Sequence, residues 1–260
     1  MFDKILQSLA PIAALAMGAG LSGCDNMNVT INGEEGVPLS ELDMAGAAPT
    51  ELVLATNVTV IITEGETLDI SVEGDSEGAL RFVLDQDSIG VMSDPDLEIR
   101  DGKATVRVTM PAPQSITIAG SGSVETGSVA ETAELTIGGS GSILAKNIAA
   151  QSLEIRIGGS GSIKGSGTAE RLEISIGGSG DVAMPSLNAN IAEVSIGGAG
   201  DVEFSSDGEV EATIAGAGDV RVTGSAKCTV SAMGSGTLTC GPGPAAAADE
   251  AQPVTDLDAQ

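Results

Sequence analysis

The chain of 260 residues contains no histidine, tryptophan or tyrosine and only three phenylalanines. It also has no Cys-x-x-Cys pair, so a zinc site and a Cys-His nucleophile both lack their usual residues. The missing rings remove a frequent general acid or base and the platforms on which sugars stack. The sequence therefore predicts no catalytic residues, no metal site and no cofactor.

Basic residues are also scarce. Eleven Lys and Arg stand against 37 Asp and Glu, which gives a formal charge of -26. Nucleic-acid binding depends on Lys and Arg neutralising phosphates, so this charge excludes a nucleic-acid partner.

No hydrophobic run is long enough to span a bilayer. The apolar stretch Ile12–Leu21 follows Lys4 and ends in small residues, which is typical of a secretory signal. The junction Leu21-Ser22-Gly23-Cys24 resembles the bacterial lipoprotein signal, in which the cysteine is lipidated and becomes the mature N-terminus. An ordinary signal with a chance cysteine is the alternative.

We expect a signal peptide over residues 1–23, a linker over 24–36 and a lipid anchor at Cys24. The anchor would hold the protein in the bacterial envelope at the inner or outer membrane, facing the periplasm or the cell surface.

Glycine, by contrast, is abundant, and much of it recurs in one motif. Versions of Ile-Gly-Gly-Ser-Gly-Asp-Val appear seven times, at intervals of 18 to 20 residues. The copies begin at Ile118, Ile137, Ile157, Ile176, Ile196, Ile214 and Ala232. A near-constant period of this length is typical of a solenoid, whose coils bury their apolar faces only against neighbouring coils.

Apolar residues keep fixed places in each copy. The first column is formed by the residues at which the copies begin. The second, two residues earlier, is Ile116, Leu135, Ile155, Ile174, Val194, Ala212 and Val230; the third, after the glycines, is Val124, Ile143, Ile163, Val182, Val202, Val220 and Leu238. Period-2 spacing puts the first two columns on one face of a strand, and the third indicates a second, short strand on another wall. The sequence thus predicts an all-β parallel β-helix of about seven coils.

The glycines themselves suggest a phosphate loop or a calcium-binding repeat. A phosphate loop opens a helix, however, whereas these glycines precede a β-branched residue and another turn. Calcium-binding repeats of the toxin type recur about every nine residues. Corners with positive φ, or tight stacking of backbone, explain the glycines better.

One column carries charge. After the third glycine it reads Ser123, Ser142, Ser162, Asp181, Asp201, Asp219 and Thr237. Three carboxylates about 5 Å apart repel one another, so something must compensate. Bonds to turn amides are one explanation, and a bridging cation is the other. We favour the amides, because a calcium site takes six to eight oxygens.

Composition divides the rest of the chain. Alternating apolar residues predict a β module over 37–110, with a helical turn near Pro38–Leu42. The repeats fill 111–240, and the Pro- and Ala-rich acidic segment 241–260 is predicted to be disordered. Cys228 and Cys240 both lie in the last coil, and in an oxidising compartment we expect them to pair. Two free buried thiols are the alternative.

The segment VTVIITEGETLDISVEGDSEGALRFVLDQDSIGVM, followed by the GSGS and GAGDV coils, resembles the GIN domain family over roughly residues 37–240. Members are described as auto-transporter adhesin head domains. The resemblance implies an exported bacterial protein, often a lipoprotein, with β-helical repeats and no established catalytic site. This chain departs from the family in its acidity and its near lack of aromatic residues.

Three functions remain to be weighed. The favoured hypothesis is a non-enzymatic, lipid-anchored envelope protein that contributes adhesion, envelope structure or binding of an unknown protein or glycan partner. The alternative is a scaffold that self-associates through its solenoid ends. A polysaccharide-active β-helix enzyme is disfavoured, because the constant period leaves no insertion in which to build a cleft.

Overall fold

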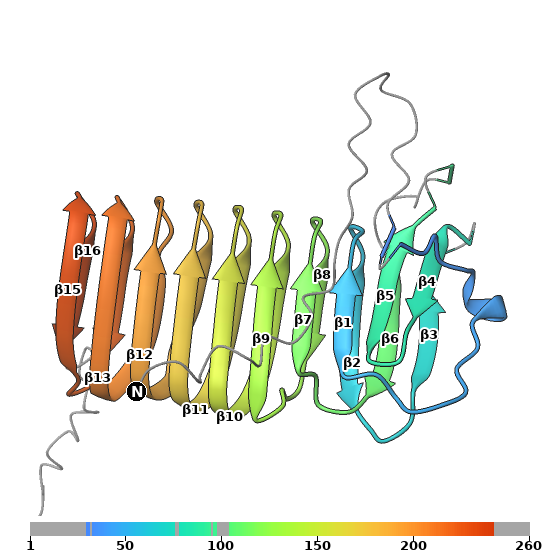
Figure 1. Cartoon of the computed structure of the whole chain (residues 1–260), viewed down its shortest axis with the longest axis horizontal. Helices are drawn as coiled ribbons and strands as arrows, with labels where there is room; N and C mark the ends of the chain where they lie inside the picture. The colour runs from blue at the N-terminus through green and yellow to red at the C-terminus, as the bar shows by residue number, and fades with distance from the viewer. Residues whose placement is uncertain (1–29, 32, 76–77, 95, 98–103, 242–260) are drawn as a thin grey trace, which may run out of the picture.

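The chain folds as a β-solenoid whose strands all belong to one coiled sheet of sixteen (Figure 1). The computed structural model describes residues 30–31, 33–75, 78–94, 96–97 and 104–241. Within these ranges the only helix is a 3₁₀ turn, Leu39–Glu41, inside the segment where the sequence predicts one. The all-β solenoid expected from the repeats is confirmed.

Each repeat contributes one strand segment to each of two walls, here called wall A and wall B. Wall A holds β7 (Ser115–Ile118), β9 (Thr132–Ile137), β15 (Lys227–Gly234) and the second halves of β10 (Ser142–Ile157), β11 (Ser162–Ile176), β12 (Asp181–Ile196) and β13 (Val202–Gly216). Wall B holds β8 (Ser123–Thr126), β14 (Asp219–Thr223), β16 (Thr237–Gly241) and the first halves of β10 to β13. Neighbouring segments run parallel, so the chain circles in one direction.

The glycine motif forms one corner of every coil, and a second corner lies inside the long strands. The sequence predicts a short second strand, but β10 to β13 run unbroken for 15 or 16 residues. Register shifts fall at this second corner, for example between Ala145 and Ile148. The glycine corner, in contrast, always places wall B five residues after the first column. Differences in repeat length are therefore absorbed at the second corner.

The predicted columns form the core. Ile137, Ile157 and Ile176 are register partners in successive coils, as are Leu135 and Ile155. From the first through the sixth copy every column residue is buried. This pattern ends at the last coil, where Val230 is 48% exposed.

The residues predicted as a β module do not form a separate layer, because their strands extend the same two walls. They are β1 (Glu51–Leu54), β2 (Thr59–Glu64), β3 (Asp69–Glu73), β4 (Leu80–Leu84), β5 (Ser88–Ser93) and β6 (Thr105–Met110). In wall A, β1 lies between β7 and β5; in wall B, β2 lies between β8 and β6. Parallel strands thus add two layers before β7.

Antiparallel strands close this N-terminal end. β4 pairs with β5 in wall A, and β3 pairs with β6 in wall B. The chain therefore reverses direction at the end of both walls, which stops the parallel coil. Because β5 and β6 lie outside β1 and β2, spatial order differs from chain order here.

The segment predicted as a linker is packed where the structure describes it. Ile31 is 1% exposed and belongs to a small cluster with Val53, Val83 and Met92. A Cβ at Gly90 would lie 2.7 Å from the Ile31 Cδ1 atom, so a glycine there allows the close approach. This part of the predicted linker therefore covers the first strands of wall A.

Within the described residues, no helix has the length and apolar character needed to cross a membrane.

Candidate functional site

The glycine corner carries the main-chain hydrogen-bond ladder around the bend. The Ser160 amide donates to the Gly139 carbonyl at 3.0 Å, and the Ser162 amide donates to the Gly141 carbonyl at 3.0 Å. Equivalent bonds join the neighbouring coils. A phosphate loop aims such amides at its ligand. Here they donate to the preceding coil and lead into a strand, which agrees with the exclusion made from sequence.

The second glycine of the corner has no room for a side chain. A Cβ at Gly159 would lie 2.2 Å from the Gly139 carbonyl oxygen, and at Gly198 it would lie 2.0 Å from the Gly178 oxygen. Of the two explanations offered by the sequence, tight stacking applies in the middle coils. Positive φ at this position is found only in the last two copies, at Gly216 and Gly234.

The first glycine of the corner is different. A Cβ at Gly158 would meet nothing closer than the Ile137 carbonyl oxygen at 3.9 Å. Larger residues are accommodated at this position, since three of the seven copies carry Ala119, Ala215 and Met233 there. Two adjacent glycines thus have different physical roles.

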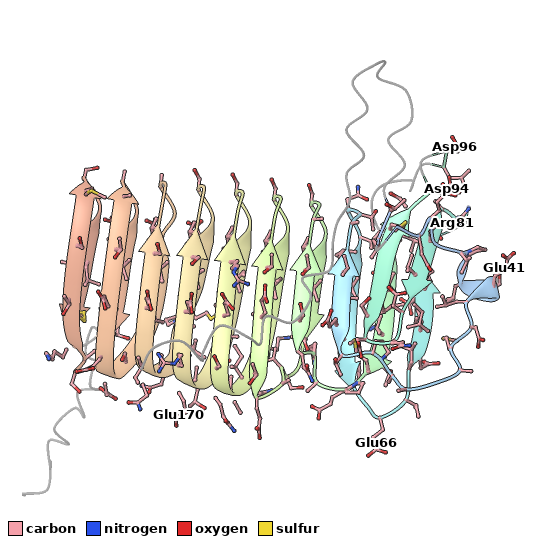
Figure 2. All side chains as sticks on the ribbon, viewed as in Figure 1. Glu41, Glu66, Arg81, Asp94, Asp96 and Glu170 are labelled. Carbon is pink, nitrogen blue, oxygen red and sulfur yellow. A yellow bond between two sulfur atoms is a disulfide. The ribbon has the colours of Figure 1, made fainter. Side chains whose placement is uncertain are left out.

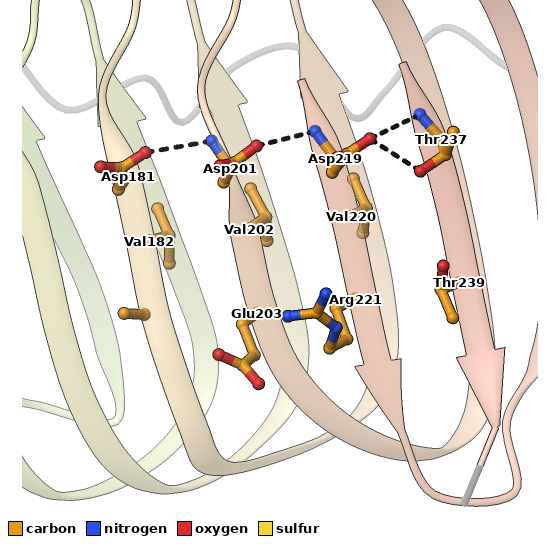
Figure 3. Close-up of a pocket in the computed structure, with 11 residues that line it drawn as sticks. Asp181, Val182, Asp201, Val202, Glu203, Asp219, Val220, Arg221, Thr237 and Thr239 are labelled. Atoms are coloured by element: carbon orange, nitrogen blue, oxygen red, sulfur yellow. Dashed lines mark hydrogen bonds between the residues drawn. The ribbon is translucent and has the colours of Figure 1, made fainter. Parts of the chain in front are cut away.

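The predicted aspartate column forms a hydrogen-bonded ladder along the edge of wall B (Figure 3). The Asp181 carboxylate accepts the Asp201 amide at 3.2 Å, and the Asp201 carboxylate accepts the Asp219 amide at 2.9 Å. The Asp219 carboxylate accepts both the amide and the hydroxyl of Thr237, at 3.1 and 2.7 Å. Each carboxylate therefore binds the coil that follows it, as the amide explanation predicts.

These aspartates border an open groove of about 360 Å³ on the outer face of wall B, beside Glu203 and Arg221. All three carboxylates are exposed and reach water as well as the amides. Among the described residues, no group of three or more Asp, Glu, Cys or His side chains is arranged to hold a metal ion. Their visible role is to join coils.

A second acidic ladder, on wall A, was missed by the sequence analysis. Its members are register partners in five successive coils: Glu134, Glu154, Glu173, Glu193 and Glu211. Each immediately precedes a residue of the second apolar column, so the repeat alignment contained the signal. The outward position of a strand facing water commonly carries a charge, which is why the column did not stand out.

The wall A ladder is partly neutralised at one end. Arg156 forms ion pairs with both Glu134 and Glu154. Even so, the pKa of Glu154 is raised above its ordinary value of 4.5, because partial burial disfavours its charge. Arg156 opposes this shift, while Glu173 and Glu134 add to it by repulsion.

Asp207, at the second corner, shows the opposite shift. Its carboxylate accepts the amide and the hydroxyl of Ser225 at 2.9 and 2.8 Å. These bonds favour the charged form and lower the pKa of Asp207. Asp207 thus joins its coil to the next one in the same way as the aspartates of wall B.

The two cysteines of the last coil form the predicted disulfide, with Cα atoms 6.6 Å apart. It joins β15 of wall A to β16 of wall B. The alternative of two free thiols is wrong. Cys24, the predicted lipidation site, and the tail beyond Gly241 lie outside the described residues.

Comparison with family models places the chain with proteins described as "putative auto-transporter adhesin, head GIN domain", over residues 48–226. A comparison with curated proteins gives no significant match.

Three solved structures share the fold. A "putative adhesin" from Bacteroides fragilis has 21% identity and a TM-score of 0.66, covering 75% of this chain and 92% of its own. A "putative lipid binding protein" from Parabacteroides distasonis has 18% identity and a TM-score of 0.59, with coverages of 76% and 94%. A "putative adhesin" from Parabacteroides merdae has 14% identity and a TM-score of 0.53, with coverages of 76% and 92%. At these identities the likeness concerns the fold alone.

The glycine corner yields a first prediction. Gly159→Ala should destabilise the protein by about 1–3 kcal/mol, because the new methyl group must push two coils apart at the backbone. Gly158→Ala is the matched control and should leave the melting temperature unchanged or slightly raised. Thermal unfolding followed by circular dichroism measures both. Equal melting temperatures for the two variants would contradict the stacking argument.

The wall A ladder yields a second prediction. A raised pKa for Glu154 means that the folded chain binds this proton more tightly than the unfolded chain, so the free energy of unfolding should rise as pH falls from neutral toward 4.5. Glu173→Gln removes one source of repulsion. It should raise the melting temperature at pH 7 and reduce the gain on acidification.

The control is Glu66→Gln, which removes the same charge at the N-terminal end of the molecule (Figure 2). It should leave the pH dependence of the melting temperature unchanged. The same acid shift in both variants would show that general charge, and not the ladder, sets the pH response.

Proposed function

This chain belongs to the GIN domain family, and we propose that it is a non-enzymatic, lipid-anchored module of the bacterial cell envelope that binds a partner through its solenoid walls. Adhesion is the form of binding that the family description favours. The partner is a protein or a glycan, and the net charge of -26 argues against nucleic acid.

The observation that carries the proposal is the uniformity of the coils. An enzyme of this architecture needs groups that converge on one place, usually beneath a long loop. Here the glycine corner has the same length in all seven copies. On the coils, the two acidic ladders run in columns along the walls and do not converge on one place. A surface that repeats in this way suits many weak contacts with an extended partner, which add through avidity.

Wall A is the surface we assign to the partner. Its five stacked glutamates form a stripe along the solenoid. An open groove of about 330 Å³ includes the last two of them and is also lined by Arg171, Ile191 and Lys227. The stripe favours a partner that presents cationic groups, whereas the groove adds polar and apolar contacts. Such contacts weaken as salt rises, because exposed charges are screened.

Attachment of the producing cells tests this role. Loss of the protein should lower attachment to immobilised matrix protein or polysaccharide, and more so at low salt. The double variant Glu193→Gln with Glu211→Gln should restore attachment only in part. The double variant Glu41→Gln with Glu66→Gln carries the same charge change at the N-terminal end (Figure 2) and should restore it fully. Unchanged attachment without the protein would reject adhesion.

The anchor is the second part of the proposal. It rests on the Leu21-Ser22-Gly23-Cys24 junction, since lipoprotein processing adds the two or more acyl chains that stable anchoring requires. Through this anchor one end of the chain is held at the membrane while the solenoid faces the periplasm or the cell surface.

Cys24→Ser tests the anchor. The variant should move from the membrane fraction to the soluble fraction while keeping its folded solenoid, because the substitution changes none of the residues that form the two walls. Metabolic labelling with a palmitate analogue, followed by fractionation, measures both effects. A Cys24→Ser chain that stays as membrane-associated as the wild type after signal cleavage would overturn the assignment.

A self-associating scaffold remains the second candidate function. The exposed last coil favours association at that end, as Val230 and Met233 show. The Val37–Phe82 bridge and the 3₁₀ turn Leu39–Glu41 cover part of the other end, which opposes an open filament because a head-to-tail polymer needs two open ends.

A further inference from the structure

In the part of the chain that the structure describes, the last of the seven coils has a neighbouring coil on one side only. Among the described residues, β15 hydrogen-bonds only to β13, and β16 only to β14. The outer edge of each strand therefore presents main-chain N–H and C=O groups to solvent. Such an edge is a template for another strand, and proteins usually blunt it with charge, proline or a covering segment.

Apolar side chains add to this exposure. Val230 is 48% exposed, whereas its register partner in the preceding coil, Ala212, is 0% exposed. Met233 is 70% exposed on the outer side of the same strand, where its register partner Ala215 is also exposed. The core of the solenoid is thus open at this end. A further layer of β-structure would bury the same positions that each earlier coil buries.

The charge pattern of the end is the third observation. The chain carries 37 acidic residues, yet residues 220–241 contain none and include Arg221 and Lys227. Among the described residues the nearest carboxylates lie one layer further in, at Asp219, Glu211, Glu209 and Asp207. If two such ends met, these carboxylates would lie three strand spacings apart, about 14 Å. That exceeds the Debye length of about 8 Å at physiological salt, so their repulsion would be screened.

The opposite end of the solenoid is closed. Its outermost strands, β3 and β4, run antiparallel to their neighbours, and Val37 pairs with Phe82 on β4. Charged side chains surround this end, including the ion pair of Arg81 with Asp94 (Figure 2). Val37 occupies part of the outer edge of β4, and the 3₁₀ turn Leu39–Glu41 packs beside it, so this cover and the surrounding charges oppose stacking of copies head to tail.

From these observations we propose that the C-terminal end of the solenoid is a homodimer interface, in which β15 and β16 pair antiparallel with the same two strands of a second copy. Strands related by a two-fold axis across their edges must run antiparallel, and such an isologous contact closes at two subunits. The disulfide between Cys228 and Cys240 links the two edge strands, so both edges are held ready for pairing.

The other occupant to consider is the chain that follows the last coil. It carries Pro242, Pro244 and Pro253, which have no amide hydrogen to give to a strand edge. The five alanines between Pro244 and Pro253 offer little apolar area. A second copy supplies main-chain partners along both edges and matching apolar side chains, which is why it is the occupant we assign.

Sedimentation of the exported Cys24→Ser chain tests the proposal, because this substitution keeps lipid and detergent out of the mass. As concentration rises, the chain should pass from one subunit to two and no further. Amide hydrogen exchange in residues 227–234 and 237–241 should slow over the same range. A monomer at all concentrations, or growth beyond two subunits, would overturn the proposal.

The double variant Val230→Glu with Met233→Glu should weaken the dimer at least about a hundredfold, because like charges then meet across the two-fold axis. Ile191→Glu is the control: this residue is 40% exposed on the side of wall A, and the dimer should be unaffected. A dimer that tolerates the double variant would place the contact elsewhere. If the double variant does not fold, the hydrogen-exchange series on the unaltered end still decides.

A chain ending at Gly241 separates the two occupants. The proposal expects the same dimer with or without residues 242–260. A full chain that stays monomeric and dimerises only after this truncation would show that the tail covers the end, and would overturn the proposal.

Discussion

The structure depends on a hydrogen-bond ladder that does not stop at the corners. Most β-turns leave the sheet, whereas here the corner amides donate to the coil beneath, as Ser160 does to Gly139. Backbone must then stack on backbone at strand spacing even where the chain bends. That distance leaves no volume for a Cβ at Gly159 or its equivalents. The glycine motif is the consequence of this spacing, and its likeness to a ligand-binding loop is coincidental.

Stacking in register also places each residue beside its equivalent. For apolar columns this builds a continuous core from Val, Ile and Leu with few aromatic residues. For acidic columns it brings like charges together, and the molecule deals with the two ladders differently. On wall B each aspartate accepts a hydrogen bond from an amide of the next coil. On wall A partial burial raises the pKa of Glu154, and the ion pair with Arg156 opposes that rise. Both ladders follow from one repeat, and together they give the walls their polar character.

A stack of coils has two ends, and in this chain the two ends are covered to different extents. The N-terminal end is finished by strands that reverse direction and by a covering segment that buries Ile31. At the C-terminal end the described residues provide the disulfide, and residues 220–241 carry no carboxylate side chain. A molecule anchored near its N-terminus would present this open end, and the long walls, away from the anchor. The binding role proposed for wall A and the pairing proposed for the end therefore meet at β15, whose outward side chains line the groove and whose main-chain edge would pair.

The sequence by itself determined the solenoid, because a period of 18 to 20 residues with apolar residues in fixed columns has few other solutions. It also located the disulfide, the aspartate column and the strands of residues 51–110. Only the tertiary structure decided how those strands are placed. Their pairing joins residues distant along the chain, such as Glu51 with Ser115, and no local periodicity records it. The roles of neighbouring glycines were decided in the same way. Gly158 and Gly159 are the same residue type, and only the distance to the backbone of the preceding coil shows that the second has no room for a side chain.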